Sequence, residues 1–395
     1  MNGFISRVAM LVASAWLAGV WVFGERFSSG DDNQRLRTLY QAKSDAAVAK
    51  GLQWLQTRQL TPARAAALGK PELSGSFQDE FAPGNTGVTA LSVMAFLAQG
   101  HLPGQGPFGD TINQGIDYLL SQQLDNGLIT SRDPAGRRSE MMYSHSIATL
   151  LLCEVSGMLD ERRQQELDRV LPRALLVLLQ AQKVPKAPAH AGGWRYVPGA
   201  RDSDLSLTGW AIMALRAARQ NGAAIPDEHI ADAIEYILKC RRADGSFTYI
   251  PGMGHGTASM TGLAILCLEL CGEHGHEAIQ PAAEFLLKNK PMQLKANQLP
   301  DPNAPAAKRA FALTAEDQHR YFAFYYCAQA MFQLGDRYWS EFAPYMYDTL
   351  LTDQNADGSW GESNVGGYSN TYKTALVVLT LTVSARQLPI YQRDE

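Results

Sequence analysis

The stretch Tyr345–Trp360, "YMYDTLLTDQNADGSW", joins an amphipathic helical run to a turn that ends in a tryptophan. A glycine in such a turn is ordinary, because glycine reaches positive φ without steric cost. A large indole two residues later must be buried, since it would otherwise leave apolar surface in water. The sequence therefore predicts that Trp360 packs against another part of the chain, and the recurrence of this pattern decides the fold.

The same order of helix, polar turn and aromatic residue recurs upstream. "AIEYILKCRRADGSF" ends at Phe247, "ALLVLLQAQ" precedes "GGWRY" with Trp194, and "GLQWLQTRQL" is followed by "GSF" with Phe77, whereas "GIDYLLSQQLDNG" keeps the helix and the glycine. Each turn is followed by a strongly apolar segment. These segments are set in register by Thr89, His145, Thr208, Thr261, Tyr325 and Thr374. Such internal repetition predicts about six helical hairpins.

In each hairpin, one helix is amphipathic and the other is apolar on nearly all sides. An all-round apolar helix is buried, so the second kind is expected inside a ring of the first. The last segment, "TALVVLTLTV", is as apolar as any other, and a linear solenoid would need a polar helix at that end. The sequence therefore predicts an all-α fold, an α/α toroid formed as one domain over residues 40–395, with an irregular loop at 291–318.

Composition narrows the function classes. The chain has 395 residues, of which 46% are hydrophobic, so it can bury a large core. A net charge of −4 with dispersed Lys and Arg excludes a nucleic-acid partner. Five cysteines without close pairing do not form a disulfide framework. Residues 1–30 place Arg7 before an apolar run from Val8 to Phe23, which predicts a signal peptide or membrane anchor and a body outside the cytoplasm.

The repeated helix, glutamine and "DGSW" turn resembles the QW-type repeats of squalene-hopene cyclases and the related repeats of protein prenyltransferase β subunits. The sequence also resembles a bacterial group of prenyltransferase and squalene oxidase repeat proteins, through segments such as "YSHSIATL", "GGWRY" and "DLSLTGW". The resemblance covers roughly Tyr40 to the end of the chain. It implies the α/α-toroid fold and an isoprenoid-like or peptide ligand in the central cavity.

The resemblance to the cyclases points to "DSDLS", which begins at Asp202 and stands where those enzymes have a DxDD motif. Their catalytic aspartate must stay protonated, through burial or a neighbouring carboxylate. Asp202 and Asp204 are therefore candidate catalytic acids, although Leu205 replaces the last aspartate of the motif. An aromatic cavity would stabilise a carbocation. Trp210 and Tyr325 are among the aromatic residues that could fill this role, and Tyr196 beside Trp194 could line the mouth of the cavity. The candidate ligand-binding residues are therefore Trp194, Tyr196, Trp210 and Tyr325.

The resemblance to the prenyltransferases implies a zinc site instead. Those β subunits bind zinc through an Asp-x-Cys motif and a later histidine, which here correspond to Asp204, Ser206 and His255. Ser206 replaces the cysteine, and a neutral hydroxyl is a poor zinc ligand. Asp204 and His255 remain the candidate metal ligands, and zinc is the one cofactor that the sequence suggests.

His145 is the other candidate catalytic residue, because it replaces the threonine of the repeat at the start of an apolar segment. It can serve in proton transfer. It can equally be an interior histidine that Tyr143 and Ser146 satisfy.

Three hypotheses follow. The chain is a ligand-binding toroid that lacks an intact DxDD or zinc motif, an enzyme of the isoprenoid class, or an interaction scaffold in the envelope. The sequence leaves open whether the protein is an enzyme and whether it has a protein partner.

Overall fold

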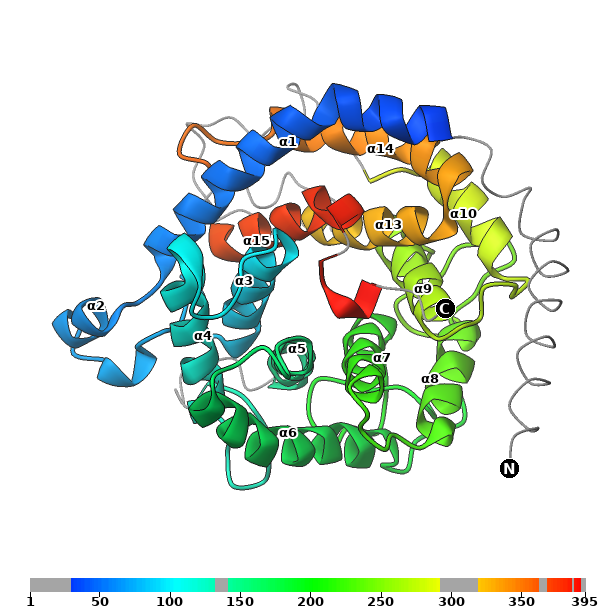
Figure 1. Cartoon of the computed structure of the whole chain (residues 1–395). Helices are drawn as coiled ribbons and strands as arrows, with labels where there is room; N and C mark the ends of the chain where they lie inside the picture. The colour runs from blue at the N-terminus through cyan, green and yellow to red at the C-terminus, as the bar shows by residue number, and fades with distance from the viewer. Residues whose placement is uncertain (1–29, 132–140, 292–318, 362–367, 386, 392–395) are drawn as a thin grey trace, which may run out of the picture.

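The computed structural model describes residues 30–131, 141–291, 319–361, 368–385 and 387–391. The helices form two concentric rings (Figure 1). The inner ring consists of α3 (Thr86–Ala98), α5 (Met141–Glu154), α7 (Leu205–Gln220), α9 (Ala258–Leu270), α13 (Arg320–Leu334) and α15 (Asn370–Leu381). The outer ring consists of α1 (Gly30–Arg58), α4 (Gly109–Ser121), α6 (Glu161–Gln182), α8 (Asp227–Lys239), α10 (Ile279–Lys288) and α14 (Asp336–Thr352). The predicted all-α toroid is confirmed.

Short elements fill the connections between these helices. Two of them, α2 (Pro62–Ala67) and η1 (Pro71–Leu73), form the polar insertion after α1, and η2 (Gly106–Phe108) precedes α4. At the end of the chain, η4 (Val383–Ala385) and η5 (Pro389–Tyr391) follow α15. The expected N-terminal segment and nearly all of the expected irregular loop 291–318 lie outside the described residues. No helix within the described ranges is long and apolar enough to cross a membrane.

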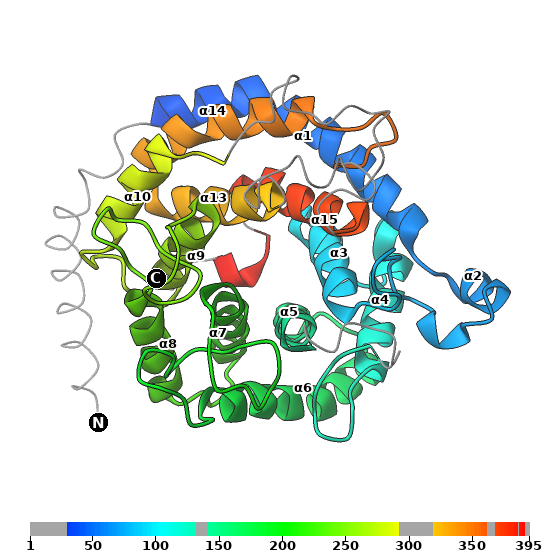
Figure 2. The same ribbon diagram turned by 180° about the vertical axis from the view of Figure 1, so that it is seen from behind.

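The inner helices are buried on nearly all sides, as their composition requires. Every residue of α3 is buried, and in α9 the buried run extends from Met260 to Leu270. The outer helices bury one face only; α8, for example, buries Ile230, Ala233 and Ile237 and exposes charged residues. Each inner helix contacts its two neighbours around the ring, and α15 returns to α3 (Figure 2). The apolar core is therefore continuous around the whole circle.

A glutamine at or just after the end of four of the outer helices ties its hairpin to a neighbouring one. Gln354 Nε2 donates to the carbonyl oxygen of Gly358 in its own turn, at 3.0 Å, and to that of Ala47 in α1, at 2.8 Å. Gln59, Gln123 and Gln182 make the corresponding pairs of hydrogen bonds, each to its own turn and to the following outer helix. The repeated glutamine is thus a connector between neighbouring outer helices.

The turn residue after the glycine is fastened to the inner helix. The backbone N–H of Trp360 donates to Thr374 Oγ1 at 3.0 Å, and its indole Nε1 donates to the carbonyl oxygen of Leu350 at 2.7 Å. Phe77, Trp194 and Phe247 make the same backbone bond to Thr89, Thr208 and Thr261. The repeated threonine therefore satisfies a backbone N–H that would otherwise be buried without a partner.

The ring closes where the last hairpin meets the first. The glycine turn of Gly358 packs directly on α1, because a Cβ built on Gly358 would lie 2.7 Å from the carbonyl oxygen of Lys50. Trp360 is fully buried beside Gly51 of α1 and Val378 of α15. The tryptophan of the deciding stretch therefore joins the two ends of the toroid.

Candidate functional site

The predicted Asp204 lies at the N-terminal end of α7, where it caps the helix. Its Oδ1 accepts the N–H of Leu207 at 2.8 Å and the hydroxyl of Ser206 at 3.1 Å. Its side chain is fully buried, and this burial raises the pKa of the Asp204 carboxyl to about 6, although the Leu207 hydrogen bond opposes the shift. The carboxyl therefore titrates near neutral pH.

Arg195 connects the two predicted aspartates. Its Nη1 lies 3.5 Å from Asp204 Oδ2, and its Nε lies 3.4 Å from Oδ2 of the half-exposed Asp202. The guanidinium also lies over the rings of Tyr196 and Tyr249, at 4.3 and 5.5 Å from their centroids. Asp202 and Asp204 therefore both contact the Arg195 guanidinium, and cation–π attraction to the two tyrosines holds this guanidinium in place.

Three tyrosines complete this end of the barrel. The hydroxyls of Tyr196 and Tyr249 are 2.5 Å apart, and the Tyr143 hydroxyl bonds Ser206 and lies 3.5 Å from Asp204 Oδ1. Burial, followed by the nearby Asp204 carboxylate, raises the pKa of the phenols of Tyr143 and Tyr249. Both phenols therefore stay protonated and can donate hydrogen bonds. We call Arg195, Tyr143, Tyr196, Tyr249 and Asp204 the mouth cluster.

The sequence reasoning did not include Tyr249 among the candidates. The repeat contains a signal for it, since Tyr249 follows Phe247 by two positions just as Tyr196 follows Trp194. Each of these two successive turns therefore contributes one tyrosine to the mouth cluster.

The candidate metal ligands differ in their surroundings. Asp204 is fully buried, whereas His255 is exposed in the loop before α9. Ser206, which stands at the cysteine position, is bonded to Tyr143. Among the described residues, no group of three or more His, Cys, Asp and Glu side chains is placed to share a metal ion. Zinc binding by Asp204 and His255 stays a prediction.

His145 occupies the threonine position of its repeat and takes over the threonine's task. Its Nδ1 accepts the backbone N–H of Ile129 at 3.0 Å, and its Nε2 lies 3.1 Å from the carbonyl oxygen of Ala174, to which it donates. Burial lowers the pKa of His145 to about 4, so the ring is neutral. Its partners are backbone groups, where the sequence suggested Tyr143 and Ser146. Both ring nitrogens are engaged, which favours the interior role over proton transfer.

The predicted ligand-binding aromatics occupy three different places. Trp194 is buried in its turn, and its Nε1 donates to the Leu178 carbonyl oxygen at 2.8 Å. Tyr196 belongs to the mouth cluster. Trp210 and Tyr325 are stacked in the interior with ring centroids 5.8 Å apart. Tyr325 also bonds the hydroxyl of Tyr391 from the C-terminal segment, which the sequence did not predict.

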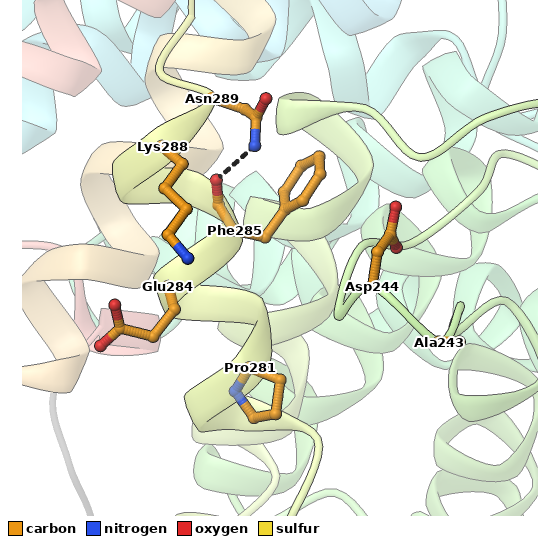
Figure 3. A pocket seen from close by; sticks show the side chains of 7 residues that line it. All are labelled: Ala243, Asp244, Pro281, Glu284, Phe285, Lys288 and Asn289. Carbon is orange, nitrogen blue, oxygen red and sulfur yellow. Dashed lines mark hydrogen bonds between the residues drawn. The ribbon is translucent and has the colours of Figure 1, made fainter.

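A pocket of about 490 Å³ lies on the outer wall, between α10 and the turn that precedes α9 (Figure 3). Its lining contains none of the predicted site residues. Two of its polar groups already have partners, since Glu284 pairs with Arg337 at 2.7 Å and Asn289 Nδ2 donates to the Phe285 carbonyl oxygen at 2.9 Å. The lining consists of Ala243, Asp244, Pro281, Glu284, Phe285, Lys288 and Asn289.

Solved structures share this architecture. A crystal structure of a protein from Actinoplanes is 17% identical, with a TM-score of 0.54 over 87% of this chain and 99% of that one. The Lin0763 protein from Listeria innocua is 11% identical, with a TM-score of 0.53 over 87% and 97%. The type II terpene cyclase MstE from Scytonema is 16% identical, with a TM-score of 0.49 over 88% and 99%. At these identities, the first two similarities show the fold alone.

No curated protein matches the sequence. The sequence model of the family described as the prenyltransferase alpha-alpha toroid domain, in contrast, matches residues 91–297 and 306–395. This match covers most of the chain and includes five of the six inner helices completely. The chain therefore belongs to the prenyltransferase α/α-toroid family.

Proposed function

We propose that the protein binds an isoprenoid-like ligand with an anionic head group, and that the mouth cluster recognises the head. The observation that carries the proposal is the position of Arg195, which lies over two tyrosine rings with only 17% of its side chain exposed. A guanidinium presents several N–H donors in one plane and suits phosphate and carboxylate groups.

The ion pairs of Arg195 with its two aspartates leave it able to bind a further anion. Its contacts with Asp202 and Asp204, at 3.4 and 3.5 Å, are longer than the roughly 2.7–2.9 Å of a strong charge-assisted hydrogen bond. Arg163, in comparison, bonds Asp117 at 2.7 Å. The phenols of Tyr143 and Tyr249 stay protonated beside the same cation, where they bond Ser206 and Tyr196, so they add no negative charge that would repel an anion.

The interior beyond the mouth cluster suits the apolar part of such a ligand. Trp210 follows Asp204 by six residues, which is about 9 Å along the helix axis. It packs on Tyr325 and also on Tyr326, with ring centroids 5.7 Å apart in the second pair. Aromatic faces of this kind accept prenyl chains by burial of apolar surface.

Ligand binding is favoured over acid-initiated cyclisation. An acid catalyst must direct its proton at the ligand, which requires hydrogen-bond reach to the reacting atom. Asp204 is fully buried, its Oδ1 accepts two hydrogen bonds at the helix cap, and its Oδ2 faces Arg195. Burial raises the pKa of Asp204 and the hydrogen bonds of the helix cap oppose that rise, so a structural role accounts for the carboxyl without a catalytic one.

The proposal is tested by calorimetric titration of the full chain with farnesyl diphosphate, farnesol and inorganic pyrophosphate. We expect farnesyl diphosphate to bind more tightly than either fragment. Arg195→Gln should weaken the binding of farnesyl diphosphate about tenfold or more, equivalent to about 1.4 kcal/mol, and leave farnesol unchanged.

Arg337 provides the matched control, because its guanidinium lies 5.1 Å from the ring centroid of Tyr338 on the outer helix α14. Arg337→Gln removes a stacked arginine without touching the mouth cluster and should bind all three probes as the unmodified chain does. Absence of binding by any probe, or equal effects of the two substitutions, would exclude the proposed site.

The proposal includes the location expected from the sequence, with residues 1–30 directing or anchoring the toroid outside the cytoplasm. The support is the apolar run from Val8 to Phe23 behind Arg7. A fusion of residues 1–40 to alkaline phosphatase, which is active only after export, should be active in cells. An inactive fusion with normal expression would argue against this location.

A further inference from the structure

The chain ends its described course inside its own ring. After α15 and η4, the segment Leu388–Tyr391 enters the space enclosed by the inner helices, where η5 contacts α7 (Figures 1 and 2). Leu388, Ile390 and Tyr391 are buried, with exposed fractions of 4%, 1% and 6%. We call Leu388–Tyr391 the internal segment. It is a short stretch of peptide surrounded by helices of the inner ring.

The ring holds the backbone of the internal segment with polar side chains. The N–H of Ile390 donates to Glu154 Oε2 at 3.2 Å, and Gln333 Nε2 donates to the carbonyl oxygen of Tyr391 at 2.9 Å. Glu154 ends α5 and Gln333 lies in the last turn of α13, so both come from the C-terminal ends of inner helices. This grip on one N–H and one C=O is how proteins recognise a bound peptide backbone.

Side-chain contacts fix the position of the segment along the barrel. The hydroxyl of Tyr391 bonds that of Tyr325, which is itself stacked on Trp210. A contact with a side chain makes binding depend on the sequence of the peptide, whereas the contacts of Glu154 and Gln333 involve only its backbone.

The fit of the internal segment is incomplete. Glu154 Oε1 is buried without a hydrogen-bond partner, although Oε2 of the same carboxyl holds Ile390. The hydroxyl of Tyr326, beside Tyr325 and Trp210, is also buried without a partner. Buried polar groups are nearly always paired in proteins, so these two groups leave hydrogen-bonding capacity that a different occupant could use.

From these contacts we infer that α5, α7 and α13 form a peptide-binding site inside the toroid, with Glu154 and Gln333 at the C-terminal ends of α5 and α13. The internal segment occupies this site as part of the same chain, and a separate peptide can displace it. The ligand class is a short peptide that forms a single helical turn, as Pro389–Tyr391 does, with a branched aliphatic residue followed by tyrosine. The backbone contacts of this site lie at the C-terminal ends of α5 and α13, whereas its contact with Tyr325 reaches the interior proposed for the apolar part of the isoprenoid.

A chain that lacks residues 388–395 tests the site in trans. A fluorescently labelled peptide of residues 387–395 is titrated against the shortened and the full chain, with anisotropy as the readout. We expect binding to the shortened chain at least tenfold tighter than to the full chain, and a several-fold loss when the peptide carries Tyr391→Phe. A folded shortened chain that binds the peptide no better than a scrambled peptide would overturn the inference.

Hydrogen exchange on the full chain decides the matter even where the shortened chain fails to fold. A displaceable segment opens more often than the ring unfolds, so the Ile390 amide should exchange at least tenfold faster than the Trp194 amide. Trp194 is the matched reference, because its N–H is equally buried and donates to Thr208 at 3.1 Å. Equal exchange rates of the two amides would show that the segment is a permanent part of the core and would overturn the inference.

The peptide experiment contains no isoprenoid, so its readout is separate from the test of the mouth cluster, although both proposals use Tyr325 and Trp210. Peptide binding without any binding of farnesyl diphosphate would leave this inference standing and exclude the isoprenoid proposal. Binding of farnesyl diphosphate without any peptide binding would exclude this inference and leave the isoprenoid proposal standing.

Discussion

Substitution of Gly358 by alanine should weaken the closure of the ring by more than the backbone effect alone. Gly358 has a φ of +95°, and Gly272 has a φ of +86°. Alanine at such an angle costs about 1–2 kcal/mol. At Gly358 the added Cβ would also lie 2.7 Å from the Lys50 carbonyl oxygen, whereas at Gly272 nothing lies within 4 Å. Relieving that overlap costs roughly a further 1–3 kcal/mol.

The free energy of unfolding should therefore fall by about 2–5 kcal/mol in Gly358→Ala and by about 1–2 kcal/mol in Gly272→Ala. For a chain of this size, each kcal/mol moves the Tm by little more than one degree, so the two variants should melt roughly 3–6 °C and 1–3 °C below the unmodified protein. Scanning calorimetry measures both values. Equal losses in the two variants would show that contact of the turn with α1 does not close the ring.

Two further predictions concern the bonds between turns and inner helices. Thr208→Val leaves the buried Trp194 N–H without its acceptor, so the free energy of unfolding in urea should fall by about 1–3 kcal/mol. Thr352→Val breaks only a bond to its own helix and should lower this free energy by less. Equal losses in the two variants would contradict the role of the threonine. Because burial lowers the folded pKa of His145 from 6.5 to about 4, its stabilising effect is complete above pH 6.5 and is lost as the pH falls towards 4, by about 3 kcal/mol in all. His145→Gln should remove this part of the pH dependence. If the pH dependence of urea unfolding between pH 4 and 6.5 were the same in this variant as in the unmodified protein, the His145 imidazole would not be held neutral in the folded protein.

The sequence was enough to predict the toroid, because its signals are local and repeated. A glutamine, a glycine and an aromatic residue recur at one register, and the glutamine makes the same pair of bonds in four hairpins, from Gln59 to Gln354. Threonine at a fixed place in the apolar helix belongs to the same pattern. Even the exception, His145, keeps the bond to the turn N–H that its position implies.

The candidate site could be predicted only in part, because its members come from different hairpins. The sequence singled out Asp204 and Tyr196, but no local pattern shows that Arg195 lies over Tyr249, more than fifty residues away. The internal segment was missed for the same reason. Its residues have no helical or strand periodicity, and Ile390 is held by Glu154, which lies 236 residues earlier in the sequence.

The closed ring also limits how this architecture can vary. A linear array gains or loses repeats at its ends, because each end contacts one neighbour only. Here the first outer helix receives Gln354 and the turn of Gly358 from the last hairpin, so no hairpin is terminal. An added hairpin would change the curvature at every helix pair at once. Diversification must therefore proceed through the segments that join the helices, while the number of hairpins stays constant.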